Sequence, residues 1–481
     1  MSENATLLEE TTKHIEALQS RKSELLYEVQ QIEKKLQDAK ARRAKLVNLA
    51  APVSKLPDEL IADIFLRCHG TRVVMSPRAM GKPFEVSASH VSSHWRRVVL
   101  STPLLWNAIS LDIGLKTRTR ALQRLSANLT RSGQCYLDIS LHITTSHNIP
   151  EILSYLTPHA ARWHRVSIAI TSGSVEDIYA PFYDVVTPAL IHLSLRIGNP
   201  EDDADSPRTE YSATCPSVLA QCSPLLKFVR IAGKVVGNLA PPLSAVQTLH
   251  VDAWPKNIMA LSQFRAMFDS LPCLSNLSLT GLSIQLPRNP LDASEPILLP
   301  ILRSLRIRGN STPCHRLLAL LSLPSLESLS LHGIHSFDSS VIPTLHALTL
   351  DQCILSEHEL QNMFRAFPCV STLGIDDSTP GIYAMLRAEA GEKGPWPKLK
   401  SIALKHLPPA DVAPFCLLVL GRASSTVPLS SVHLDRRSRT VLRAKDFLEV
   451  LRELLPVENC DYLAPWPAYL GYDDPDDVWL Y

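Results

Sequence analysis

Apolar residues recur along most of the chain in the pattern L-x-x-L-x-L, usually after a proline. Successive copies begin 19 to 36 residues apart, a spacing at which repeats of one supersecondary unit stack on one another. The alternation at the end of each copy predicts a short parallel strand with one buried face. The copies begin at Trp163, Leu190, Leu226, Val246, Leu274, Leu302, Leu326, Leu345, Val370, Leu399 and Leu429.

Segments with helical spacing lie between several of the predicted strands, and a proline closes three of them. These repeats resemble leucine-rich repeats, although they lack the regular asparagine that usually ends the strand turn. The resemblance implies an α/β solenoid, which we place at residues 113–455. A parallel β-helix is the competing solenoid, but it has no helical returns. The predicted return helices span residues 258–271, 315–323, 357–367 and 410–420.

Both ends of the repeat array differ from the repeats themselves. Residues 109–113 and 137–143 alternate as strands do, and residues 115–131 have the pattern of a basic amphipathic helix. After a predicted helix at 443–455, residues 456–481 gather aromatic side chains around an acidic run. Because a solenoid needs its last core covered, we favour a cap here over a partner-binding acidic tail. The aromatic residues are Tyr462, Trp466, Tyr469, Tyr472, Trp479 and Tyr481, and the acidic run is Asp473-Asp474-Pro475-Asp476-Asp477.

The first 50 residues carry a heptad repeat without glycine or proline. We predict one long helix over residues 1–50 and a coiled-coil partner or self-association through its seam, at 7–46. A parallel pair of identical helices would set glutamate against glutamate and lysine against lysine, so an antiparallel or heterotypic partner fits at least as well. The alternative is a solitary amphipathic helix leaning on the next segment, because two basic residues interrupt the seam. The seam positions are Leu8, Thr11, Ile15, Leu18, Lys22, Leu25, Val29, Ile32, Leu36, Ala39, Arg43 and Leu46.

Residues 51–112 contain short helical patterns rich in large apolar side chains. Pro57 fits the first position of a helix, and Asp58 and Glu59 suit its positive end. Further on, Val91 and Trp95 share a second predicted helical face with the valine at position 98. A segment of this size is near the lower limit for a self-sufficient core, so a partner or the rest of the chain must cover the apolar surface.

Three blocks in this segment, taken together, resemble an F-box. They read Leu56-Pro57-x-Glu59-Leu60-x-x-x-Ile64-Phe65, then Val91-x-x-x-Trp95-Arg96, then Leu100-Ser101-Thr102-Pro103-Leu104-Leu105-Trp106. The run 91–106 is especially similar to F-box proteins of the large fungal families. Two features depart from the family pattern: residues 69–83 lengthen the link between blocks, and Ser92 stands where the family often has cysteine. The alternative is a set of ordinary core helices in a larger α domain.

The resemblance implies that this segment docks on a Skp-type adaptor and, through it, on the cullin of a ubiquitin ligase. The repeats would then bind a protein substrate, so that the chain supplies proximity and no bond chemistry. The alternatives are a repeat scaffold that recruits no ligase and, more remotely, a β-helix enzyme acting on polysaccharide. The residues implied to form the adaptor-facing surface or its immediate support are Leu56, Pro57, Leu60, Ile61, Ile64, Phe65, Val91, Trp95, Leu105 and Trp106.

The sequence contains no recognisable catalytic constellation: it has no phosphate-binding glycine loop, no G-x-S-x-G elbow and no H-E-x-x-H. We therefore expect no enzymatic activity, no cofactor and no metal. The strand positions expected to face solvent are small or polar, which suits docking of a protein segment. Arg230, Arg306 and Arg308 are the candidate substrate-binding residues, since they could attract an acidic or phosphorylated partner. The expected solvent-facing positions are Ser167, Ser194, Arg230, His250, Ser278, Arg306, Ser330, Thr349, Gly374, Ala403 and His433.

Composition narrows the class of protein and its compartment. With 45% hydrophobic and 20% charged residues, the chain is typical of soluble globular proteins. A formal net charge of +1 argues against nucleic acid or a membrane surface as the main partner. The N-terminus is charged and no run approaches eighteen apolar residues, so we expect a cytoplasmic or nuclear protein. The ten cysteines lack metal-ligand spacing and are expected to be reduced, mostly buried thiols.

Overall fold

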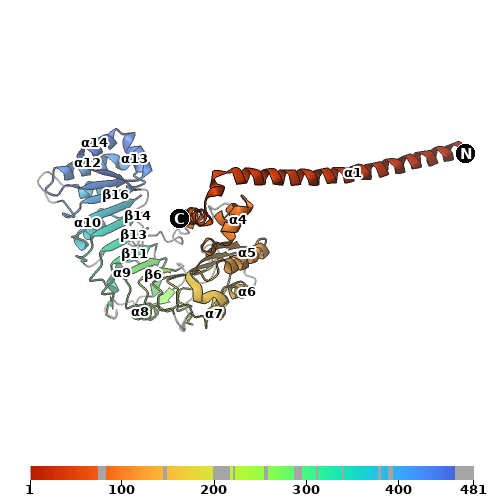
Figure 1. The fold of residues 1–481 in the computed structure, drawn as a ribbon. Helices are drawn as coiled ribbons and strands as arrows, with labels where there is room; N and C mark the ends of the chain where they lie inside the picture. Colours follow the sequence, from red (N-terminus) through yellow and green to blue (C-terminus); the bar gives the residue numbers. More distant parts are fainter. Residues whose placement is uncertain are drawn as a thin grey trace. The chain divides into compact units, whose positions relative to one another are not determined.

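The computed structural model describes residues 2–73, 83–144, 149–198, 217–219, 223–253, 258–285, 295–309, 313–338, 341–377, 381–387 and 394–460. These residues form a mixed α/β structure with one long N-terminal helix and one large parallel sheet (Figure 1). They divide into two compact units. We call them the helical unit, which lies within residues 1–105, and the sheet unit, which begins at Trp106.

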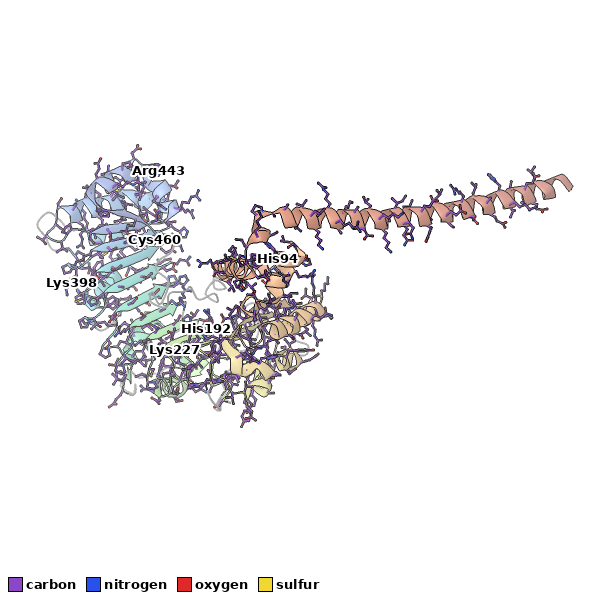
Figure 2. All side chains as sticks on the ribbon, viewed as in Figure 1. His94, His192, Lys227, Lys398, Arg443 and Cys460 are labelled. Atoms are coloured by element: carbon purple, nitrogen blue, oxygen red, sulfur yellow. The ribbon has the colours of Figure 1, made fainter. Side chains whose placement is uncertain are left out.

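The helical unit begins with α1, Ser2–Ala50, which confirms the long helix predicted from the heptads. At 49 residues it is about 73 Å long. It ends before the short 3₁₀ turn η1, Pro52–Lys55, because proline cannot continue the helical hydrogen bonds. Side chains project from all sides of α1 (Figure 2), and every one from residue 7 to residue 47 is exposed. Over these residues, the apolar side of α1 therefore does not pack on the next segment, contrary to the alternative considered from the sequence.

The described part of the helical unit also contains three shorter helices and a second 3₁₀ turn: α2 Asp58–Val73, α3 Phe84–Ser89, α4 Ser93–Leu100 and η3 Pro103–Leu105. The predicted start of α2 is confirmed, with Asp58 and Glu59 in its first turn. Helix α4 begins later than predicted, because Ser92 caps it: the Ser92 hydroxyl accepts a hydrogen bond from the Trp95 amide at 3.1 Å. Val91 therefore precedes the helix and does not share a helical face with Trp95.

Among the described residues, the sheet unit is built around fourteen strands that pair in chain order, and every pairing is parallel. Each predicted copy of the repeat supplies one of these strands, which confirms the strand predictions. The apolar positions align across the sheet: Leu305 of one strand pairs with Leu277 on one side and Leu329 on the other. The strands are β1 Ala108–Ile113, β2 Leu137–Ile143, β3 Trp163–Ile170, β4 His192–Ile197, β5 Phe228–Gly233, β6 Thr248–Asp252, β8 Asn276–Thr280, β11 Ser304–Arg308, β13 Ser328–His332, β14 Ala347–Asp351, β15 Thr372–Asp376, β16 Ser401–Lys405, β17 Ser431–Leu434 and β18 Val457–Asn459.

Helices connect many of these strands, and α9 and α10 lie along the same side of the sheet in Figure 1. Apolar side chains from strands and helices form one continuous buried cluster from Ile109 to Leu455. That cluster is the hydrophobic core of the sheet unit. The helices are α5 Arg118–Arg131, α6 Ile149–Ser154, α7 Glu176–Phe182, α8 Leu261–Asp269, α9 Cys314–Ala319, α10 Glu357–Ala366, α11 Ile382–Leu386, α12 Val412–Ala423, α13 Arg436–Arg443 and α14 Phe447–Leu454, with 3₁₀ turns η4 Thr157–Arg162 and η6 Pro409–Asp411.

Two of the predicted return helices are shorter than expected because short strands occupy part of each segment. The segment 258–271 opens with β7, Ile258–Ala260, which pairs with β9, Ser283–Gln285. The segment 315–323 ends with β12, Leu321–Ser322, which pairs with β10, Ile297–Leu298. Apolar spacing alone does not distinguish a short strand from the end of a helix.

The unit boundaries also differ from the predicted ones. Trp106 belongs to the sheet unit, so residues 106–112, assigned by sequence to the F-box-like segment, form the start of the sheet instead. The Arg131 guanidinium lies 4.4 Å from the centre of the Trp106 ring, a cation–π contact within the sheet unit. At the other end β18 extends the sheet into the predicted cap. The aromatic and acidic residues from 461 onward lie outside the described residues.

Candidate interaction surfaces

The apolar residues of the F-box-like blocks divide into buried and exposed sets. Leu60, Ile64 and Val91 are 53%, 46% and 54% exposed, so these three positions can meet a partner directly. Pro57 is also exposed, while Leu56 and Trp95 are half-buried. Four of the implied adaptor-facing residues are instead buried and could act only as internal support: Ile61, Phe65, Leu105 and Trp106.

An aromatic contact and a polar cluster join α2 to α4 in the helical unit. Phe65 packs edge-on against Trp95, with ring centres 4.8 Å apart. The polar cluster joins the start of α2 to α4: His94 Nε2 lies 2.7 Å from Asp58 Oδ1 (His94 is labelled in Figure 2), and Arg97 Nη2 lies 3.1 Å from Asp58 Oδ2. The hydrogen bond from His94 lowers the pKa of the Asp58 carboxyl. Asp58 therefore positions α2 as well as stabilising its N-terminus.

A buried polar cluster lies on the side of the sheet opposite the apolar core, on strands β5 to β11. Arg230 Nε donates to Asp252 Oδ2 at 2.6 Å, and both side chains are nearly inaccessible to solvent. Arg306 Nε donates to Ser278 Oγ at 2.8 Å, and its Nη2 lies 3.5 Å from His250 Nδ1. Because guanidinium groups stay charged, such burial requires hydrogen bonds and countercharge from neighbouring groups.

The first residues of strands β4, β5, β6 and β8 are also buried. The ring of His192 on β4, labelled in Figure 2, stacks on Phe228 of β5 with ring centres 4.1 Å apart. Asn276 Nδ2 donates to Thr248 Oγ1 at 3.0 Å on the adjacent strand. Hydrogen bonds and ring contacts thus run from strand to strand across this part of the sheet.

The prediction that these strand positions face solvent is wrong for the central strands. Six of the eleven predicted positions are buried: Ser194, Arg230, His250, Ser278, Arg306 and Gly374. Arg230 and Arg306 are 4% and 2% exposed, so they are not available as an open substrate-binding surface, and Arg308 is half-buried. Residue alternation identifies the side of a strand that faces away from the apolar core, but it does not reveal whether other atoms cover that side.

Histidine–carboxylate pairs join neighbouring strands near both ends of the sheet, and the sequence did not predict them. His142 Nδ1 lies 3.1 Å from Asp112 Oδ1, its partner in the strand register. Near the other end, His406 Nδ1 and Lys405 Nζ lie 2.7 Å and 2.9 Å from the two oxygens of Asp376. The partners are about 30 residues apart in sequence, so only the strand register could have paired them.

The eight cysteines in the described part of the chain are free thiols, and four of them are buried, whereas the sequence predicted mostly buried thiols. Cys314, Cys353, Cys416 and Cys460 are buried, whereas Cys68 and Cys273 are exposed. Burial raises the pKa of the Cys314 thiol to about 12 and that of Cys353 to about 11. The two thiols are therefore protonated at neutral pH and behave as small apolar core residues.

Comparisons with known proteins add no family assignment: the chain matches no protein-family model and no curated protein significantly. Among the described residues, no three histidine, cysteine, aspartate or glutamate side chains are grouped as a metal site would need. In the same part of the chain, no helix combines the length and the apolar character needed to span a membrane.

Proposed function

We propose that the chain is a substrate receptor of a cullin–RING ubiquitin ligase of the Skp–cullin–F-box type. In this proposal the helical unit docks on the Skp-type adaptor, and the sheet unit binds a protein substrate. The observation that carries it is the set of exposed apolar side chains at motif positions of the helical unit. Leu60 and Ile64 lie one helical turn apart on α2 and leave apolar surface in water that a partner would cover.

The order of the motif blocks supports the same proposal. The block from Leu56 to Phe65 coincides with the start of α2, and the last block coincides with the end of α4 and η3. Ser92, which stands where the family often has cysteine, caps α4 in this chain. The segment 69–83, which lengthens the link, is described only to residue 73 and at residue 83.

The sheet unit supports a leucine-rich-repeat-like solenoid as the substrate-binding part. Each repeat contributes one parallel strand beside the strand of the preceding repeat, which is the arrangement expected of stacked repeats. Because Arg230 and Arg306 are buried, we propose that the substrate contacts the later strands, β13 to β17. There the middle positions Ser330, Thr349 and His433 are only half-buried.

Recovery of the adaptor with the purified chain tests the proposal. The double variant Leu60→Asp/Ile64→Asp alters only exposed side chains, so the helical unit should fold while docking is lost. The matched control is Leu115→Asp, which places the same charge at a residue 76% exposed in the sheet unit. Leu56→Ala/Pro57→Ala is a second test at the first motif block.

We expect the wild type and the Leu115 variant to recover a Skp-type adaptor and a cullin, and the double variant to recover neither. Circular dichroism and thermal unfolding of each variant establish that the fold is intact. If the folded wild type recovers no adaptor, or if the double variant recovers as much as wild type, the receptor proposal fails. The chain would then be better explained as a repeat scaffold that recruits no ligase. The burial of Ile61, Phe65 and Leu105 within the chain is consistent with that function.

A further inference from the structure

The seam of α1 is an apolar stripe without cover in the single chain. Its large side chains are 45% to 70% exposed along the helix, from Leu8 to Leu46. A helix of 49 residues with such a stripe gains stability when a second helix packs along it. The charged side chains on either side of the stripe determine the identity and the direction of the second helix, because they lie opposite the flanking side chains of that helix.

A parallel pair of identical α1 helices places like charges together. The flanking positions that would meet are Glu28 with Glu33, and Lys35 with Lys40. An antiparallel pair with complete overlap is no better. In that register the numbers of facing seam residues add up to 54, and those of the flanking residues that meet add up to 56. Arg21 therefore meets Lys35, and the two copies of Glu28 meet each other.

Shifting the antiparallel pair by one heptad removes these conflicts. The numbers of facing seam residues then add up to 47, and those of the flanking residues that meet add up to 49. Arg21 of each copy therefore meets Glu28 of the other. The register sets Arg43, one of the two basic seam residues, opposite position 4 near the end of the overlap, away from the apolar layers. Lys22 meets Leu25, where its aliphatic stem can cover the leucine while its ammonium group reaches water. The remaining layers join Leu8 with Ala39, Thr11 with Leu36, Ile15 with Ile32, and Leu18 with Val29.

We propose that a second copy of this chain occupies the seam, in an antiparallel coiled coil with that register. The two reciprocal Arg21–Glu28 contacts select the direction and the register, and the apolar layers supply the affinity. The inference rests on α1 alone and is independent of the proposed ligase function. It implies that the C-terminal ends of the two α1 helices lie at opposite ends of the coiled coil.

Cross-linking of full-length chains tests direction and register together. A chain carrying Ile15→Cys is mixed with a chain carrying Ile32→Cys, and a short bifunctional maleimide is added. We expect a cross-linked pair joining positions 15 and 32, identified by peptide mass, and no 15-to-15 product from the first chain alone. The parent chain, treated in the same way, accounts for the native cysteines, of which Cys68 and Cys273 are exposed.

Each other arrangement gives a different product and would overturn the proposal. A 15-to-15 product indicates a parallel pair. A product from Ile15→Cys mixed with Ala39→Cys, in place of the first pair, indicates the register of complete overlap. A chain that remains monomeric in sedimentation at tens of micromolar excludes self-pairing altogether and leaves a different helix as the occupant.

Charge reversal provides a second, independent readout. Arg21→Glu sets glutamate against Glu28 twice per dimer and should raise the dimer Kd roughly tenfold. Glu28→Arg should weaken pairing similarly, and the double variant should restore wild-type affinity because both contacts are re-formed with reversed sign. In the register of complete overlap, Arg21→Glu would instead meet Lys35 and tighten the dimer, which would overturn the proposed register.

Discussion

At the scale of single residues, the structure separates side chains that are alike in sequence. Arg303 and Arg306 lie three positions apart, yet Arg303 is exposed immediately before β11 and Arg306 is buried within it. The Arg306 guanidinium donates to the Ser278 hydroxyl on the neighbouring strand. Arg306 is therefore expected to contribute to the stability of the sheet unit, contrary to its predicted role in an open binding surface.

Replacing Arg306 by alanine should lower the free energy of unfolding by about 2–4 kcal/mol, because the change removes buried hydrogen bonds and leaves a cavity. Arg303→Ala is the matched control, and its effect should stay within about 0.5 kcal/mol. Urea unfolding of both variants measures the difference. Equal stability of the two variants would mean that the Arg306 environment contributes nothing to folding.

At the scale of elements, one carboxylate connects the start of α2 to α4 in the helical unit. Asp58 contacts both His94 and Arg97, and its pKa lies below the ordinary value of 3.8, chiefly because of the hydrogen bond from His94. Since the folded state favours the ionised carboxylate, the contact stabilises the unit above that ordinary value. The stabilisation is lost as the pH falls through the lower, folded-state pKa.

Hydrogen exchange of the α4 amides should therefore accelerate, after correction for the intrinsic pH dependence, when the pH falls below about 4. Asp58→Asn should show the faster exchange already at neutral pH and a weaker response to acid. Asp63→Asn is the control on the same helix, because Asp63 forms its ion pair within α2, with Arg67. If Asp58→Asn and the control behave alike, the connection between α2 and α4 does not depend on Asp58.

At the scale of the whole molecule, the chain contains two units with separate cores. Ile61 is buried in the helical unit and Ile307 in the sheet unit, and each is 1% exposed. The two units also differ in kind: one contains a long helix and a few short ones, and the other a long sheet stabilised by contacts between neighbouring strands. We expect them to unfold in separate transitions.

The same conservative change in each core tests this expectation. Ile61→Val and Ile307→Val should each cost about 0.5–1.5 kcal/mol, and each should shift only the transition of its own unit in scanning calorimetry. The shift should be larger in degrees for the smaller helical unit. The double variant should show the sum of both changes, since the sites share no partners. A single transition that moves with either change would show one cooperative unit instead.

The sequence by itself determined the elements with a strong apolar period. Alternation predicted the strands of all the repeats, the heptads without glycine or proline predicted α1, and Pro57 with two acidic residues predicted the start of α2. These features depend on contacts within one element or between equivalent positions of neighbouring repeats, so a local pattern is enough to specify them.

Only the tertiary structure decided which of those positions are accessible. It buried Ile61 beside the exposed Leu60, buried Arg306, and assigned Trp106 to the sheet unit. It also brought Asp58 to His94 and Arg230 to Asp252. The physical reason is that a periodic pattern defines the apolar side of an element, whereas the exposure of its other side depends on atoms that are distant in sequence and meet it only on folding.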